Sequence, residues 1–182
     1  NAGEDREVQV PHDGDPNTDT VYVTLDCSAT DAENDVTTVV WDDVAGCDGT
    51  ECTIPLTEGS YSFTCTATDT YGASSSDTVG IMVHPEPNEA PIADAGEDLG
   101  VEVDHDGDPD TDTVDVTLDC SATDAENDVI TIEWDVEGCD GAECTIELTA
   151  SPDPYSFTCT ATDSYGDSHS DTVDIFVIGE PS

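Results

Sequence analysis

The chain has 182 residues, of which 45 are Asp or Glu and only one is Lys or Arg, so its formal net charge is −44. The chain has no basic patch to meet phosphate, so its composition excludes nucleic acid and anionic membrane as electrostatic partners. It also lacks the apolar run of 18 or more residues that a membrane-spanning helix requires. Because charge of one sign destabilises a compact state, we expect bound divalent cations, or molar salt around a halophile, to screen it.

Strands are predicted along the whole first half, because apolar residues alternate there with polar ones and no helical period occurs. In chain order we expect strands at 8–10, 21–27, 39–41, 54–56, 61–67 and 79–83. The exposed faces are rich in Thr, which suits a solvated strand. The sequence therefore predicts an all-β protein.

An internal repeat divides the chain in two. The segment TLDCSATDAENDV at 24–36 returns at 117–129, and Cys27 corresponds to Cys120, 93 residues later (120 − 27 = 93). About this length forms one β-sandwich domain. Three prolines between positions 85 and 91 make a stiff, extended connector. We therefore predict two tandem domains, residues 1–87 and 88–182, arranged as a rod.

Each half contains four cysteines. Their spacing lacks the two tight pairs of a zinc site, so disulfides formed in an oxidising, exported compartment are favoured. Cys27 and Cys65 face the expected core with Trp41 between them in sequence, an order that resembles the inter-sheet disulfide and packed Trp of immunoglobulin domains. This resemblance implies the pairs Cys27–Cys65 and Cys120–Cys159, and the remaining cysteines then pair locally as Cys47–Cys52 and Cys139–Cys144.

Acidic loops are the motifs that carry chemistry, because calcium takes several oxygen ligands from carboxylates, carbonyls and water. The Asp-x-Asp loop at 12–19 returns at 105–112, the DAEND loop at 31–35 returns at 124–128, and an Asp precedes a Tyr-Gly turn in each half. Several such loops per domain favour calcium over merely solvated loops. The predicted ligands are Asp13, Asp15, Asp19, Asp31, Glu33, Asp35, Asp69, Asp106, Asp108, Asp110, Asp112, Asp124, Glu126, Asp128 and Asp163.

The sequence offers no catalytic constellation, so we predict a protein that is not an enzyme. His169 lies between two serines, but the matching place in the first half has Ser74 and Ser75 without a histidine. Paired carboxylates are too common here to indicate glycosidase chemistry.

The order of the motifs resembles the polycystic-kidney-disease (PKD) domain family. The second half carries PIADAGED at 91–98, TLDCSATD at 117–124, IEWD at 132–135 and FTCTATDSYG at 157–166, and the first half carries the same series from Ala2. The resemblance implies an immunoglobulin-like β-sandwich from extracellular multidomain proteins, often in arrays and often binding calcium. Four cysteines per domain depart from the usual pattern and indicate selection for mechanical toughness.

The topology implied by this resemblance brings the loop at 12–19 of the first domain toward the loop at 124–128 of the second. Carboxylates from two domains would repel each other there unless calcium bound between them. The linker residues on this path complete the predicted ligand set: Glu86, Asn88 and Glu89.

The leading hypothesis is a calcium-stiffened structural repeat of an extracellular microbial fibre, filament or adhesin. Because residues 89–93 have no counterpart at the chain's ends, we expect head-to-tail assembly with copies of itself or with further repeats of the same chain. One alternative is an accessory carbohydrate- or matrix-binding module of a secreted hydrolase, for which Tyr22, Tyr71 and Tyr165 are the expected exposed aromatics. Another is a halophile cell-envelope protein whose acidity serves solvation.

Overall fold

The computed structural model describes residues 1–42, 44–105, 107 and 113–179. The chain divides into two compact units, Asn1–Pro87 (unit 1) and Asn88–Ser182 (unit 2), at the boundary that the repeat predicts. The described residues form strands, turns and loops, and none of them belongs to a helix that could cross a membrane.

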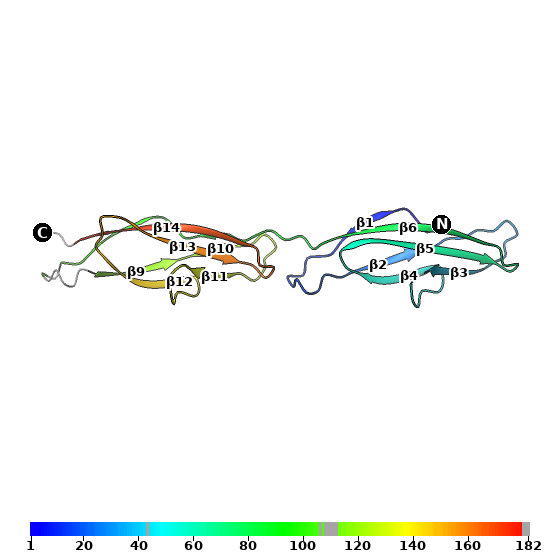
Figure 1. Cartoon of the computed structure of the whole chain (residues 1–182), viewed down its shortest axis with the longest axis horizontal. Coiled ribbons are helices and arrows are strands. Elements are labelled where there is room, and N and C mark those ends of the chain that lie inside the picture. The colour runs from blue at the N-terminus through cyan, green and yellow to red at the C-terminus, as the bar shows by residue number, and fades with distance from the viewer. Residues whose placement is uncertain (43, 106, 108–112, 180–182) are drawn as a thin grey trace. The chain divides into compact units, whose positions relative to one another are not determined.

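Unit 1 is built from two sheets, which Figure 1 shows as separate layers. The first layer has four strands in the order β1 (Arg6–Gln9), β6 (Ser74–His84), β5 (Gly59–Asp69) and β3 (Val36–Asp42). The second layer pairs β2 (Val21–Asp26) with β4 (Glu51–Leu56). Strand β1 runs parallel to β6, and the other pairs are antiparallel.

Unit 2 repeats both sheets and contains one further strand pair. Its four-stranded sheet has the order β11 (Thr131–Trp134), β13 (Tyr155–Thr162), β14 (Ser168–Ile178) and β8 (Leu99–Glu102). The opposite layer contains β12 (Glu143–Thr149) paired with β9 (Thr113–Asp119). The additional pair joins β7 (Ile92–Asp94) to β10 (Ser121–Thr123) in antiparallel register.

The core of each unit forms from the alternating apolar residues of the strands. In unit 1, Leu25, Trp41 and Ile81 are at most 2% exposed. The opposite faces of the strands carry hydroxyl groups that pair between neighbouring strands, as Thr64 does with Thr78 at 3.1 Å. The alternation of inward and outward side chains expected from the period-2 pattern is therefore confirmed for these strands.

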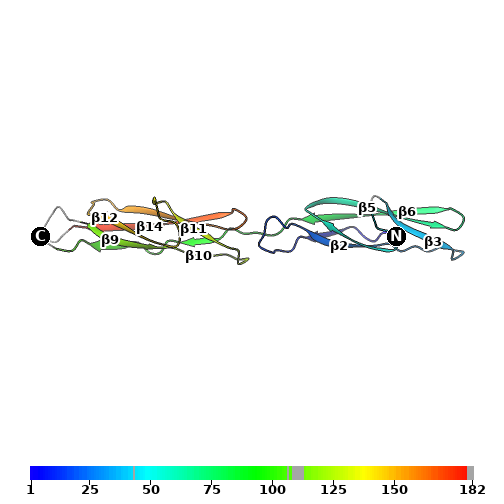
Figure 2. The ribbon, with the colours of Figure 1, turned by 90° about the horizontal axis from the view of Figure 1, so that it is seen from below.

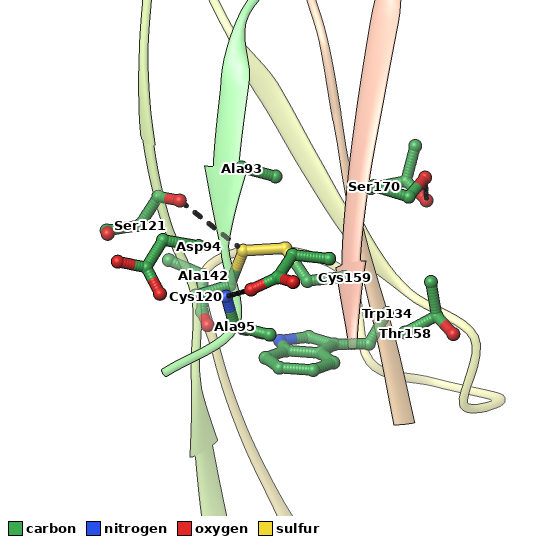
Figure 3. Close-up of a disulfide and its surroundings, with 12 residues drawn as sticks. Ala93, Asp94, Ala95, Cys120, Ser121, Trp134, Ala142, Thr158, Cys159 and Ser170 are labelled. Carbon is green, nitrogen blue, oxygen red and sulfur yellow. Dashed lines mark hydrogen bonds between the residues drawn. A yellow bond between two sulfur atoms is a disulfide. The ribbon is translucent and has the colours of Figure 1, made fainter. Parts of the chain in front are cut away.

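Four disulfides join the layers and staple a turn in each unit. They link Cys27 to Cys65, Cys47 to Cys52, Cys120 to Cys159, and Cys139 to Cys144, as the sequence predicts. Figure 3 shows Trp134 next to the disulfide of Cys120 and Cys159. The indole N–H of Trp134 donates to the carbonyl oxygen of Ala142 at 3.2 Å, which satisfies the one polar atom of this buried ring.

Candidate metal centres

The acidic loop at 124–128 is a turn that its own first carboxylate holds together. Asp124 Oδ1 accepts the backbone N–H groups of Glu126 at 3.0 Å and Asp128 at 2.9 Å. Asn127 adopts a left-handed backbone conformation with φ 67°, which Asn tolerates better than most residues. The loop therefore presents the carboxylates of Asp124 and Asp128 on one side of a fixed turn.

Asp163 follows β13 and ties the next loop in the same way. Its Oδ1 accepts the backbone N–H groups of Tyr165 and Asp167, each at 2.9 Å, and its Oδ2 accepts the side-chain amide of Asn88 at 3.0 Å. Asp163 is 7% exposed. Burial by itself raises the pKa of Asp163, but the Asn88 amide and the backbone donors outweigh it and lower that pKa below the ordinary value. Asp163 is therefore held as a buried anion.

These three aspartates form a cluster. One carboxylate oxygen from each of Asp124, Asp128 and Asp163 lies within 4.8 Å of the other two. Two oxygens are buried and have no hydrogen-bond partner, namely Asp124 Oδ2 and Asn88 Oδ1. Calcium binds oxygens at about 2.3–2.6 Å, so ligand oxygens up to about 5 Å apart can share one ion. The cluster has the size and the donor type of a calcium site.

Unit 1 contains the matching cluster of Asp31, Asp35 and Asp69, which is less buried. Hydrogen bonding between the two carboxyl groups lowers the pKa of Asp31 and raises that of Asp35, and the negative charges of Asp31 and Asp69 raise the pKa of Asp35 further. The carboxylates of this cluster therefore repel one another, and a bound cation would offset that repulsion.

In the loop at 12–19, the carboxylates of Asp13 and Asp15 cap the local turn. Asp13 Oδ1 accepts the N–H of Asp15 at 3.0 Å, and Asp15 Oδ1 accepts the N–H of Asn17 at 3.0 Å. The Thr18 hydroxyl and the Asp15 N–H lower the pKa of Asp13. In the described part of the chain, the only groups of three metal-ligating side chains are the two aspartate clusters, so Asp13, Asp15 and Asp19 form no such group.

The other predicted ligands take different positions. Glu126 Oε2 accepts the N–H of Glu89 at 3.2 Å, which ties the start of unit 2 to the acidic loop. Glu33 is exposed and contributes its backbone N–H to Asp31. Glu86 is buried within unit 1, with Oε1 2.9 Å from His12 Nδ1. Four predicted ligands lie outside the described residues: Asp106, Asp108, Asp110 and Asp112.

Sequence reasoning missed Asp167 and misplaced one aromatic. Asp167 Oδ2 accepts the Asn88 amide at 2.9 Å, but the matching position in unit 1 is Ala73, so the repeat gave no signal for it. Tyr22 and Tyr71 are 73% and 88% exposed, as expected. The expectation that Tyr165 is exposed is wrong, because its ring is half-buried and its hydroxyl is buried.

No model of a known protein family matches the sequence, and curated proteins give no significant match. Solved structures of tandem β-sandwich domains do align with it. The fibronectin(III)-like modules of Clostridium thermocellum CbhA share 14% identity at a TM-score of 0.36, over 96% of this chain and 90% of that one. Mouse cadherin-23 EC22-24 shares 16% identity at a TM-score of 0.38, over 96% of this chain and 63% of that one.

The Ig1-2 module of the Drosophila receptor protein tyrosine phosphatase DLAR shares 14% identity at a TM-score of 0.31, over 97% of this chain and 96% of that one. Each unit of the present chain has two stacked sheets joined by a disulfide beside a buried Trp. The fold is immunoglobulin-like, present twice. Membership of the PKD family stays a prediction.

Proposed function

We propose that each unit binds calcium at its aspartate cluster and that the chain serves as a calcium-stabilised structural or adhesive repeat outside the cell. The observation that carries this proposal is the buried Asp124 Oδ2, which has no hydrogen-bond partner and belongs to a side chain that clusters with Asp128 and Asp163. A buried carboxylate oxygen is costly unless a donor or a cation compensates it. With one Lys or Arg against 45 acidic residues, the compensating charge has to come from outside the chain.

Calcium suits these clusters better than other common metals. The ligands are hard oxygens without cysteine thiolates, since all eight cysteines are in disulfides, and no histidine belongs to either described cluster. Extracellular modules bind calcium at roughly 10⁻⁴ to 10⁻³ M, which matches a site with three carboxylates and solvent access. The disulfides favour an oxidising compartment, where calcium at this concentration is available.

The extracellular microbial fibre or adhesin remains our preferred setting. Tandem immunoglobulin-like repeats with disulfides and charged, hydroxyl-rich faces suit a load-bearing or adhesive role. Assembly head to tail with copies of itself is part of this proposal. Electron microscopy in millimolar calcium would test it separately, because a strictly monomeric chain under that condition contradicts assembly but not calcium binding.

Asp124→Asn tests the site in unit 2. The new Oδ1 still accepts the N–H groups of Glu126 and Asp128, so the turn is kept, but one charged ligand is lost. Calorimetric titration of the full chain should show calcium binding at unit 2 weakened by about tenfold or more, while unit 1 still binds. Asp115→Asn removes the same charge from an exposed position on β9 and should leave binding unchanged. If the two variants and the wild type bound calcium with the same affinity and the same number of sites, that result would contradict the proposed site.

A further inference from the structure

Two carboxylates hold the side-chain amide of Asn88 at the start of unit 2. Asn88 Nδ2 donates to Asp163 Oδ2 at 3.0 Å and to Asp167 Oδ2 at 2.9 Å. An Asn amide has two N–H groups, so both of them are used here. Turning the amide over would place its carbonyl oxygen against two negative carboxylates. These contacts therefore fix the orientation of the amide.

The carbonyl oxygen of this amide is buried and has no hydrogen-bond partner. Because the oxygen and nitrogen of an amide are only about 2.3 Å apart, Asn88 Oδ1 lies within about 5 Å of Asp163 Oδ2. Asp124 Oδ2, from the same aspartate cluster, is also buried without a partner. Unit 2 contains no Lys or Arg, since the one such residue of the chain is Arg6. A cation from outside the chain would satisfy both oxygens.

Asp167 lies beside the cluster without belonging to it. Its side chain is exposed, and the group of converging carboxylates consists of Asp124, Asp128 and Asp163 among the described residues. Figure 2 shows the loop that follows β10 and the loop that precedes β14 at the same end of unit 2. The first loop carries Asp124 and Asp128, and the second carries Asp163 and Asp167. Asp167 can therefore act on the site through Asn88.

The turn at the end of β13 does not require the Asp167 side chain. The N–H of Asp163 donates to the carbonyl oxygen of Asp167 at 3.0 Å, and the N–H of Asp167 donates to Asp163 Oδ1 at 2.9 Å. Unit 1 forms the same two bonds between Asp69 and Ala73, at 3.0 and 2.8 Å. Because Ala is sufficient for this turn, the Asp167 carboxylate is left for its contact with Asn88.

We propose that Asp167 is a positioning residue of the calcium site in unit 2, where it holds the Asn88 amide so that the carbonyl oxygen binds the ion. This inference rests on the proposed calcium binding at the aspartate cluster. Asn88 Oδ1 and one oxygen from each of Asp124, Asp128 and Asp163 then supply protein ligands, and water completes the six to eight oxygens that calcium takes. Groups that orient a metal ligand in this way contribute strongly to metal affinity.

The same contacts link calcium to the docking of residues 88 and 89 on unit 2. The N–H of Glu89 donates to Glu126 Oε2 at 3.2 Å, and the N–H of Glu126 donates to Asp124 Oδ1 at 3.0 Å. The start of unit 2 thus contacts both loops that carry the cluster. Because coupling between two equilibria is reciprocal, calcium strengthens the docking of this segment, and the docked segment strengthens calcium binding.

Two substitutions in the full chain test the role of Asp167 by calorimetric titration with calcium. Asp167→Ala removes the acceptor for the Asn88 amide but keeps the turn, as Ala73 does in unit 1. The calcium affinity of unit 2 should fall by about tenfold or more. Asp167→Asn removes the charge but keeps an acceptor oxygen, so it should restore most of the affinity. Unchanged affinity in Asp167→Ala, or an equal loss in both variants, overturns the positioning role.

Amide hydrogen exchange at Glu89 gives a readout that does not depend on the titration. In the wild type, calcium should slow this exchange by about tenfold or more, and Asp167→Ala should remove most of the protection. Protection that persists in Asp167→Ala overturns the coupling to Asp167. If the wild type binds no calcium at unit 2, the proposed function fails together with this inference. If the wild type binds calcium and Asp167→Ala binds it equally well, the inference fails alone.

Discussion

The aspartates of the two clusters divide their two oxygens between two tasks. In Asp124 and Asp163, Oδ1 accepts two backbone N–H groups and fixes a turn. The second oxygen of Asp163 accepts the Asn88 amide, whereas Asp124 Oδ2 is buried without a donor, and one oxygen of each carboxylate lies within 4.8 Å of the others. This division explains why a short acidic loop can be rigid and still offer metal ligands. Carboxylates of the loop at 12–19 instead complete local turns.

At the residue scale, Asp171 gives a prediction about pH. The backbone N–H groups of Ala95 and Thr172 donate to its carboxylate and lower its pKa. Because the pKa in the folded state lies below that in the unfolded state, the stability from Asp171 is present above the ordinary Asp value of about 3.9 and is lost as the pH falls through the lower folded value.

The measurement is urea unfolding of the wild type and of Asp171→Asn from about pH 6 to about pH 2 in chelator. Asn keeps an acceptor for the Ala95 N–H but does not titrate. The wild type should therefore lose its advantage over the variant as the pH falls. A difference in the free energy of unfolding that stays constant over this range would show that Asp171 contributes no pH-linked stability.

At the element scale, the strands were predictable because a strand alternates its side chains with a period of two. The inward positions of Leu25, Trp41 and Ile81 follow from that period, and the cysteine pairing follows from the strands and from the immunoglobulin resemblance. The DAEND loops and the two Tyr-Gly turns were found because they repeat. Pattern reasoning thus identified the members of both aspartate clusters.

The sequence pattern could not reveal contacts that occur in only one of the two units. Asp167 reaches Asn88 only in unit 2, since Ala73 stands in its place in unit 1. Composition also gave no means to distinguish carboxylates that converge from carboxylates that cap local turns.

The disulfides give a prediction at the same scale, because they close loops of different length. Cys27 and Cys65 are 38 residues apart, whereas Cys47 and Cys52 are 5 apart. In the chain-entropy model, the long loop contributes about 4 kcal/mol to the free energy of unfolding and the short one about 2 kcal/mol.

Replacing Cys47 and Cys52 together by Ser should therefore destabilise unit 1 about half as much as replacing Cys27 and Cys65 together. A variant with Ala instead of Ser at Cys27 and Cys65 avoids burying hydroxyl groups in the core and serves as the control. Guanidinium unfolding curves of the variants give the comparison. A larger loss from the short pair than from the long pair would mean that the turn, rather than the inter-sheet bond, limits the stability of the unit.

At the scale of the whole molecule, the excess of acidic residues is the property to be explained. Screening by salt weakens repulsion among all exposed carboxylates, but it gives no advantage to two particular clusters. Specific binding acts at the clusters and stabilises the folded state by mass action. When the free calcium concentration is one to ten times the dissociation constant, this stabilisation is about 0.4–1.4 kcal/mol per site. The calcium and halophile hypotheses therefore differ in which ion raises the melting temperature.

Thermal unfolding of the full chain tests the central claim most directly, in millimolar calcium, in chelator, and in chelator with molar KCl. Calcium should raise the melting temperature above that in chelator, and Asp124→Asn should reduce this increase while Asp115→Asn does not. KCl should not substitute for calcium. A melting temperature that is the same in calcium and in chelator, but rises with molar KCl alone, would contradict calcium binding and leave the acidity to serve solvation in high salt.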